Sequence, residues 1–157
     1  MITLKSEGSG NWREKSRRLA AAGGVTLTTA SNYLTADVSS TGSANTFVDG
    51  PSVSLTAGTW HVTWKCNIAG IVAAPVVTVK LWDGTTTWDA QGQYCSNTGN
   101  QHVFAGSAIV VLAATTTVKL SFAYNTSGGT EGARMDATPD LNSPGNYASG
   151  INAVKVA

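Results

Sequence analysis

The strictest two-residue alternation in the chain runs from Trp60 to Ile68. The apolar members of this run are Trp60, Val62, Trp64, Cys66 and Ile68, and the residues between them are His61, Thr63, Lys65 and Asn67. Successive side chains of a β-strand point to opposite faces of its sheet. The pattern therefore predicts an antiparallel strand with one face in a core and the other facing solvent.

The same alternation recurs along the rest of the chain. Val77, Val79 and Leu81 form a second apolar set, and a third runs from Val118 to Tyr124. Shorter strands are predicted at Val25–Ala30, Tyr33–Val38, Thr46–Val48, Val53–Leu55, Thr86–Gln91, His102–Leu112 and Ile151–Val156. Glycine-containing turns separate the runs, among them Asp49-Gly50-Pro51 and the hairpin signal Asp83-Gly84. Short strands at this spacing predict an all-β sandwich or barrel.

Composition excludes several classes of protein. Charged residues make up 12% of the 157 residues, about half of the usual globular share of roughly 25%, and surface helices depend on such residues. The net charge is +1, and phosphate contacts need clustered cations, so we expect no nucleic-acid partner. No apolar run approaches the roughly 20 residues of a membrane span, and the N-terminus lacks the apolar core of a signal peptide. We therefore expect no membrane partner, and folding in the cytosol.

The first 24 residues differ from the rest and are predicted to form a docking arm before a single domain at 25–157. Five of the ten Lys and Arg residues lie in this arm, with only two acids. Met1–Asn11 is expected to be extended or disordered, and Glu14–Ala22 to form a short helix that ends at Gly23. An aromatic anchor flanked by cations suits an acidic surface, although a disordered tail is the alternative. The docking candidates are Lys5, Trp12, Arg13, Lys15, Arg17 and Arg18.

The chemistry-bearing residues form no recognisable catalytic or metal-binding motif. His61 and His102 lie in strand patterns, away from any nucleophile motif, so we expect no enzymatic activity. The carboxylates Asp83, Asp89, Asp136 and Asp140 lack calcium-loop spacing and are expected to be solvated turn residues. No cofactor is implied. Cys66 and Cys95 are expected to be small buried residues, with a disulfide between them as the alternative.

Two features suggest interaction surfaces. Trp60 and Trp64 belong to the inward set of their strand, but Trp82 and Trp88 flank the Asp83-Gly84 turn. Trp82 and Trp88 are candidates for a protein interface, for local packing or for contact with a glycan. A second candidate surface is apolar on both faces of its predicted strand: Ile109, Val110, Val111 and Leu112. Monomers rarely expose large apolar patches, so we expect these residues to form a trimer interface.

The order of several motifs resembles a known group of proteins. The motifs are the Thr56-Ala-Gly-Thr-Trp60 turn before the long strand, VVTVKLWDGTT from Val76, FAGSAIVVLAATTTVKLSFAY from Phe104, and GINAVKV from Gly150. This order, from Val25 to Ala157, is similar to that of the trimeric jelly rolls of bacteriophage fibres, spikes and capsid decorations. Those domains are similar in layout to the globular heads of the complement and tumour necrosis factor family.

The resemblance implies a fold and a function. The fold would be an antiparallel jelly-roll sandwich of about eight strands that forms a homotrimer. The function would be that of a virion structural protein, a capsid decoration or short head fibre assembled in a bacterial cytoplasm. Its arm would bind the major capsid protein or another virion protein. The alternative is a receptor-binding fibre head, or a lectin-like adhesin that contacts host glycans.

Overall fold

The computed structural model of this chain describes residues 2–6, 12–17, 27–40, 43–69, 76–95, 101–125, 133–138 and 148–157, the first two ranges as backbone alone. These residues form strands and no helix, so none of them belongs to a helix able to cross a membrane. The strands are β1 (Ile2–Ser6), β2 (Trp12–Arg17), β3 (Thr29–Tyr33), β4 (Val38–Ser39), β5 (Val48–Leu55), β6 (Gly58–Ala69), β7 (Val76–Trp82), β8 (Thr87–Tyr94), β9 (His102–Leu112), β10 (Thr116–Tyr124), β11 (Arg134–Met135) and β12 (Gly150–Lys155).

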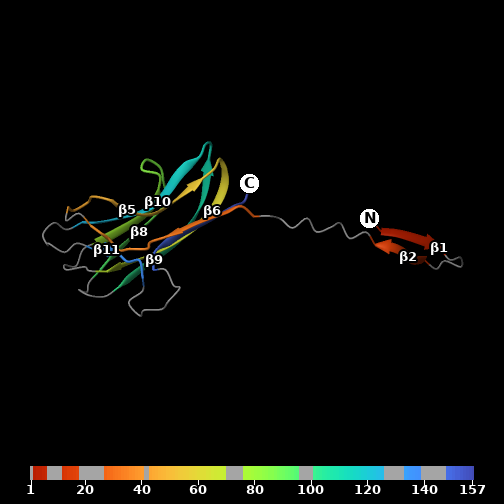
Figure 1. Cartoon of the computed structure of the whole chain (residues 1–157), viewed down its shortest axis with the longest axis horizontal. Helices are drawn as coiled ribbons and strands as arrows, with labels where there is room; N and C mark the ends of the chain where they lie inside the picture. Colours follow the sequence, from red (N-terminus) through yellow and green to blue (C-terminus); the bar gives the residue numbers. More distant parts are fainter. Residues whose placement is uncertain are drawn as a thin grey trace.

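Two antiparallel sheets pack face to face as a sandwich (Figure 1). Sheet I has the order β3-β12-β6-β9, and the short strands β11 and β4 extend it beside the end of β6. Sheet II has the order β5-β10-β7-β8. Eight strands thus form the body of the sandwich, and apart from the β7–β8 hairpin, neighbours in each sheet are not consecutive in the chain. This is the predicted antiparallel jelly roll.

Strand β6 confirms the alternation predicted from Trp60 to Ile68. Trp60, Trp64 and the three smaller apolar residues of the set are buried, while His61, Thr63 and Lys65 are exposed. The two buried indole N–H groups each have an acceptor, because Trp60 donates to the Thr56 carbonyl and Trp64 to Asp89, both at 2.9 Å. Asn67 departs from the pattern: it is buried, and its side-chain amide donates to the Gln101 side chain at 3.2 Å.

The hairpin between β7 and β8 forms at the predicted Asp83-Gly84 turn. Gly84 has a φ of 104°, a conformation that side chains disfavour. The Asp83 carboxylate accepts hydrogen bonds from the backbone N–H groups of Thr85 and Thr86, both at 2.7 Å. These bonds lower the pKa of Asp83 below its ordinary value. Asp83 is therefore a turn-forming carboxylate, as predicted.

The predicted turn at Asp49-Gly50-Pro51 is wrong, because these residues lie inside β5. The register between β5 and β10 shifts here, so that Gly50 and Pro51 lie between the pairs Ser121–Asp49 and Lys119–Ser52. A bulge tolerates proline within a strand, since the residue there does not donate to the ladder. The two short strands predicted at Thr46–Val48 and Val53–Leu55 are therefore one strand.

The N-terminal arm contains a β-hairpin in which β1 pairs with β2, and Figure 1 shows it apart from the sandwich. The helix predicted over Glu14–Ala22 is wrong for Glu14–Arg17, which belong to β2; its remaining residues lie outside the described ranges. Pairing with β1 outweighs the modest helix preference of these residues. Ile2–Ser6 is extended, as expected.

The two cysteines are free, and both are buried in the core. Burial raises the pKa of the Cys66 thiol and that of the Cys95 thiol. The thiols are therefore protonated at neutral pH and behave as small apolar groups. The structure thus agrees with the expectation of buried cysteines and not with the disulfide alternative.

Candidate functional site

The outer face of sheet I is broad and carries little charge. The strand registers align its residues in three rows, which are Thr29–Val154–His61–Ile109, Ser31–Asn152–Thr63–Ser107 and Tyr33–Gly150–Lys65–Ala105. Lys65 is the only Lys, Arg, Asp or Glu in these rows. The Tyr33 hydroxyl donates to the Asn152 side chain at 2.5 Å, which holds the aromatic ring beside β12. The face formed by β3, β12, β6 and β9 is therefore nearly uncharged, and the Arg134–Asp37 pair lies beyond it, at β11.

Strand β9 forms the apolar edge of this face. Val103, Ile109 and Val111 are 63%, 59% and 69% exposed, and they are three of the seven large hydrophobic side chains exposed in the described residues. Val156 follows β12 and is also exposed. An apolar group of this kind, next to uncharged neighbours, is typical of a surface that another protein covers.

The predicted trimer residues divide between the two sides of β9. Val110 and Leu112 lie in the core of the sandwich, and Ile109 and Val111 lie on the outer face. The strand is therefore apolar on both faces, as the sequence indicates. Only Ile109 and Val111 of the four are placed where a second subunit can reach them.

The outer face of sheet II is more polar and carries an aromatic cluster. The Lys80 ammonium lies 3.7 Å from the centre of the Phe47 ring and 3.2 Å from that of the Trp82 ring. The Trp82 indole N–H donates to the Ser121 hydroxyl at 2.6 Å. These contacts fix Trp82 against the sheet, in agreement with the local-packing alternative. Trp88 instead packs against the hydrophobic core, so the two tryptophans do not form one surface.

A carboxylate network continues from this cluster. Asp49 accepts hydrogen bonds from Lys119 at 2.6 Å and from the Ser121 hydroxyl at 2.5 Å. Burial of the carboxyl opposes ionisation, but the two hydrogen bonds and the nearby ammonium groups hold the pKa of Asp49 below its ordinary value. Burial lowers the pKa of Lys80, and Asp49 partly offsets this effect. The network satisfies its own charges and so offers little to a charged ligand.

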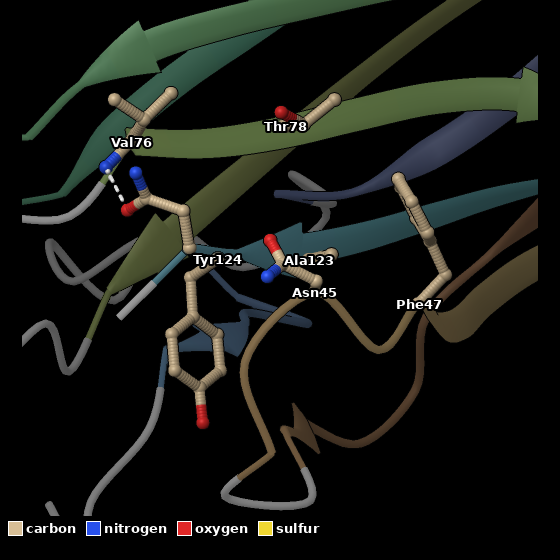
Figure 2. A pocket seen from close by; sticks show the side chains of 7 residues that line it. Asn45, Phe47, Val76, Thr78, Ala123 and Tyr124 are labelled. Atoms are coloured by element: carbon tan, nitrogen blue, oxygen red, sulfur yellow. Dashed lines mark hydrogen bonds between the residues drawn. The ribbon is translucent and has the colours of Figure 1, made fainter. Parts of the chain in front are cut away.

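A pocket of about 90 Å³ opens beside this cluster (Figure 2). Val76 and Thr78 of β7 line one side, Asn45 and Phe47 line the other, and Ala123 lies between them. Tyr124 and Asn125 complete the lining. The backbone holds the pocket in place, because the Asn45 N–H donates to the Tyr124 carbonyl at 2.7 Å and the Asn125 N–H to the Val76 carbonyl at 3.1 Å.

A buried polar cluster lies at the β11 end of the sandwich. Asp136 is 1% exposed and accepts hydrogen bonds from Arg134 at 2.7 Å and Gln101 at 2.8 Å. Arg134 also lies 3.5 Å from Asp37. The expectation of a solvated carboxylate is therefore wrong for Asp136, because folding brings these residues over it. The same expectation is wrong for Asp89, which lies within β8, is half-buried and accepts from the Trp64 indole. Burial raises the pKa of Asp136 despite the hydrogen bonds. Asp140 lies outside the described residues.

The other candidate residues occupy separate places. His61 is exposed on sheet I, and His102 begins β9 with its Nε2 atom buried and unbonded. Within the described residues, no group of three or more His, Cys, Asp or Glu side chains could hold a metal ion.

The arm candidates lie along the hairpin. Lys5 is opposite Arg13, Trp12 is opposite Ser6 and Arg17 is opposite Ile2. Lys15 lies where the register shifts, and Arg18 lies outside the described residues.

Comparison with known proteins identifies the fold and no family. No protein-family model matches the chain, and neither does any curated protein. Among solved structures, a chain of T=1 particles derived from infectious bursal virus is similar, with a TM-score of 0.51 and 14% identity over 82% of this chain. This chain spans 31% of that one.

A second solved structure has the same degree of similarity. The Eiger TNF of S. frugiperda also gives a TM-score of 0.51 and 14% identity, over 83% of this chain and 93% of its own. Identity this low establishes the fold alone. The sandwich is therefore a jelly roll of the kind seen in a viral capsid protein and in a tumour necrosis factor.

Proposed function

We propose that this chain is a non-enzymatic virion protein of a bacteriophage, a capsid decoration or short head fibre. Three copies associate through the outer face of sheet I, and the arm binds the major capsid protein or another virion protein. The observation that carries the proposal is the nearly uncharged outer face formed by β3, β12, β6 and β9, with Ile109 and Val111 exposed on its edge strand β9. Protein interfaces are depleted of charge in their central region in the same way.

The fold supports this role without requiring it. A viral capsid protein is among the similar structures, and a jelly roll offers two sheet faces for contacts. The arm gives the trimer three docking elements. A weak contact from each arm adds up in a trimer, because the second and third arms bind at a high effective concentration.

The association through sheet I can be tested by two substitutions on its outer face. Ile109→Glu together with Val111→Glu places charges where the proposal buries apolar groups, at a cost of several kcal/mol across a trimer. Sedimentation of residues 25–157 is expected to show a trimer for the native sequence and a monomer for the double variant. Thr117→Glu with Thr87→Glu, on exposed positions of sheet II that are not paired with each other, is the matched control and should remain trimeric. A native fragment that sediments as a monomer at micromolar concentration contradicts the proposal.

A receptor-binding head that contacts host glycans is the second candidate. The specific observation that favours it is the pocket on sheet II, which the virion role leaves unexplained. Imaging of the parent particle distinguishes the two, since density over the capsid supports decoration and density at the tail tip supports receptor binding.

A further inference from the structure

The pocket on sheet II has the size of a chemical group and not of a whole ligand. Enclosed ligand sites are usually about 300–1,000 Å³. The observed 90 Å³ therefore suits one substituent, with the rest of the ligand lying over the surface. The surface beside it is suited to this, because Val76 pairs with Tyr94 on β8 and the Tyr94 side chain is 62% exposed.

The lining of the pocket presents polar side-chain groups that have no hydrogen-bond partner among the described residues. Within the described residues, the side chains of Asn45 and Thr78 make no hydrogen bond. Asn125 uses its side-chain oxygen to accept from the Val76 N–H at 2.9 Å, which leaves its amide N–H₂ group as a donor. Asn45 is exposed and has a φ of 59°, a conformation that asparagine adopts more readily than most residues. Two amides and one hydroxyl thus surround the opening.

The same lining is uncharged and partly apolar. None of its residues carries a formal charge, and Val76, Ala123 and Phe47 supply carbon surface. Phe47 lies at one end of the pocket (Figure 2), and the Lys80 ammonium group lies over its ring at 3.7 Å from the ring centre. The lining residues therefore cannot form an ion pair with a charged ligand. A small group that has a carbonyl, an N–H and a methyl matches the amide donors, the hydroxyl and the carbon surface of the lining.

We propose that this pocket binds the acetamido group of an N-acetylated hexosamine in a glycan. The methyl group packs against Val76 and Ala123, the carbonyl accepts from an asparagine amide, and the N–H donates to the Thr78 hydroxyl. The sugar ring lies beside Phe47, since aromatic faces suit the C–H side of a sugar, and the next residue of the glycan extends toward Tyr94. This site goes beyond the virion role and does not depend on docking by the arm.

Titration of the full chain with N-acetylglucosamine, followed by NMR, tests the proposal. We expect saturable shifts in the low millimolar range, confined to the amides of residues 45–47, 76–78 and 123–125, and no such shifts with glucose, which lacks the acetamido group. Thr78→Val keeps the side-chain shape and Asn45→Gly suits the backbone conformation. Each variant should weaken binding about fivefold, the effect of one lost hydrogen bond. Thr117→Val, on the same sheet face but away from the pocket, is the control and should bind normally.

Three results would overturn the proposal. They are the absence of shifts at tens of millimolar N-acetylglucosamine, equal shifts with glucose, and binding that Thr78→Val and Asn45→Gly leave unchanged. Because the titration uses only the chain and a sugar, these results are independent of capsid binding. If the full chain binds N-acetylglucosamine but does not bind capsids, the result contradicts the virion role and leaves the sugar site standing.

Discussion

Trp64 shows at the scale of one residue how packing and hydrogen bonding combine in this core. Its side chain is 3% exposed, and its indole N–H donates to Asp89 from the neighbouring sheet. Gly106 lies on β9 beside it, where an added Cβ would meet the Trp64 ring at 2.7 Å. The glycine therefore makes room for the tryptophan, and the tryptophan links the two sheets at their β8–β9 edge.

Truncation of this residue should be costly. Trp64→Ala is expected to destabilise the fold by about 3–5 kcal/mol, because it leaves a cavity and removes the donor to Asp89. Thr63→Ala, the exposed neighbour, should change stability by less than about 0.5 kcal/mol. Chemical denaturation of both variants measures the difference. Equal stabilities would show that the register of β6 is shifted by one residue.

Asp136 is the residue whose environment should make stability depend on pH. Burial raises its pKa in the folded chain above the value in the unfolded chain. The folded chain then binds a proton more readily, so the stability due to this group is fully present below the unfolded pKa and is lost as pH rises through the folded pKa. Asp49 has the opposite effect on stability, because its folded pKa is lowered: its contribution is present above the unfolded pKa and is lost as pH falls through the folded pKa.

Comparison with Asp136→Asn isolates this contribution. As the pH falls from 7 to 4, the unfolding free energy of the native chain should improve relative to that of the variant. Denaturant titrations at several pH values give the two curves. Parallel curves would mean that the Asp136 carboxyl titrates alike in both states, contrary to its burial.

At the scale of an element, the β7–β8 hairpin depends on a residue with an unusual backbone. Gly84 has a positive φ, and an added Cβ would make only ordinary contacts with Lys119, at 3.9 Å or more, so its requirement is conformational. Gly92 lies within β8 of the same hairpin, where an added Cβ would make ordinary contacts at 3.8 Å or more. The two positions therefore differ in backbone conformation and not in the space available for a methyl group.

Alanine at these positions should give opposite results. Gly84→Ala is expected to cost about 1–3 kcal/mol through strain in the turn. Gly92→Ala should be neutral or slightly stabilising, because it reduces the entropy of the unfolded chain. Thermal unfolding checks both variants. A Gly84→Ala variant as stable as Gly92→Ala would contradict the turn geometry.

At the scale of the whole molecule, the chain divides into a sandwich with a complete core and an arm with a separate hairpin (Figure 1). A two-stranded hairpin alone is at best marginally stable in water. Its register also places Lys5 opposite Arg13, and like charges in opposite positions are unfavourable. The hairpin is thus expected to gain stability on contact with an acidic partner, as the docking role requires.

Removal of the arm tests that role. Deletion of residues 1–23 should leave a folded trimer that no longer binds the particle. Reversal of Arg13, Arg17 and Arg18 to Glu should weaken binding and reduce its salt dependence, because exposed charge contacts are screened by salt. Trp12→Ala should weaken binding at every salt concentration. Cosedimentation with particles measures all three, and full occupancy by the truncated trimer would rule out the arm as the anchor.

Local pattern was sufficient to predict the strands whose faces differ in polarity. The alternations at Trp60–Ile68, Val77–Leu81 and Val118–Tyr124 each predicted the buried face correctly, because burial on one side of a strand imposes a period of two on its sequence. The Asp83-Gly84 turn could likewise be predicted from its local sequence. These segments, together with composition and motif order, indicated an antiparallel jelly roll.

The remaining features arise from contacts between residues far apart in the chain. Asp136 is buried with Gln101 and Arg134 as its hydrogen-bond partners. The sheet II pocket brings Asn45, Thr78 and Asn125 together through strand pairing and backbone hydrogen bonds. No short-range pattern marks these residues, since each is an ordinary polar residue in its own segment. The hairpin at β2 likewise required its partner β1, because pairing energy decides between strand and helix where local preference is weak. The sequence by itself determined which faces are apolar, and the tertiary structure decided which polar groups those faces bring together.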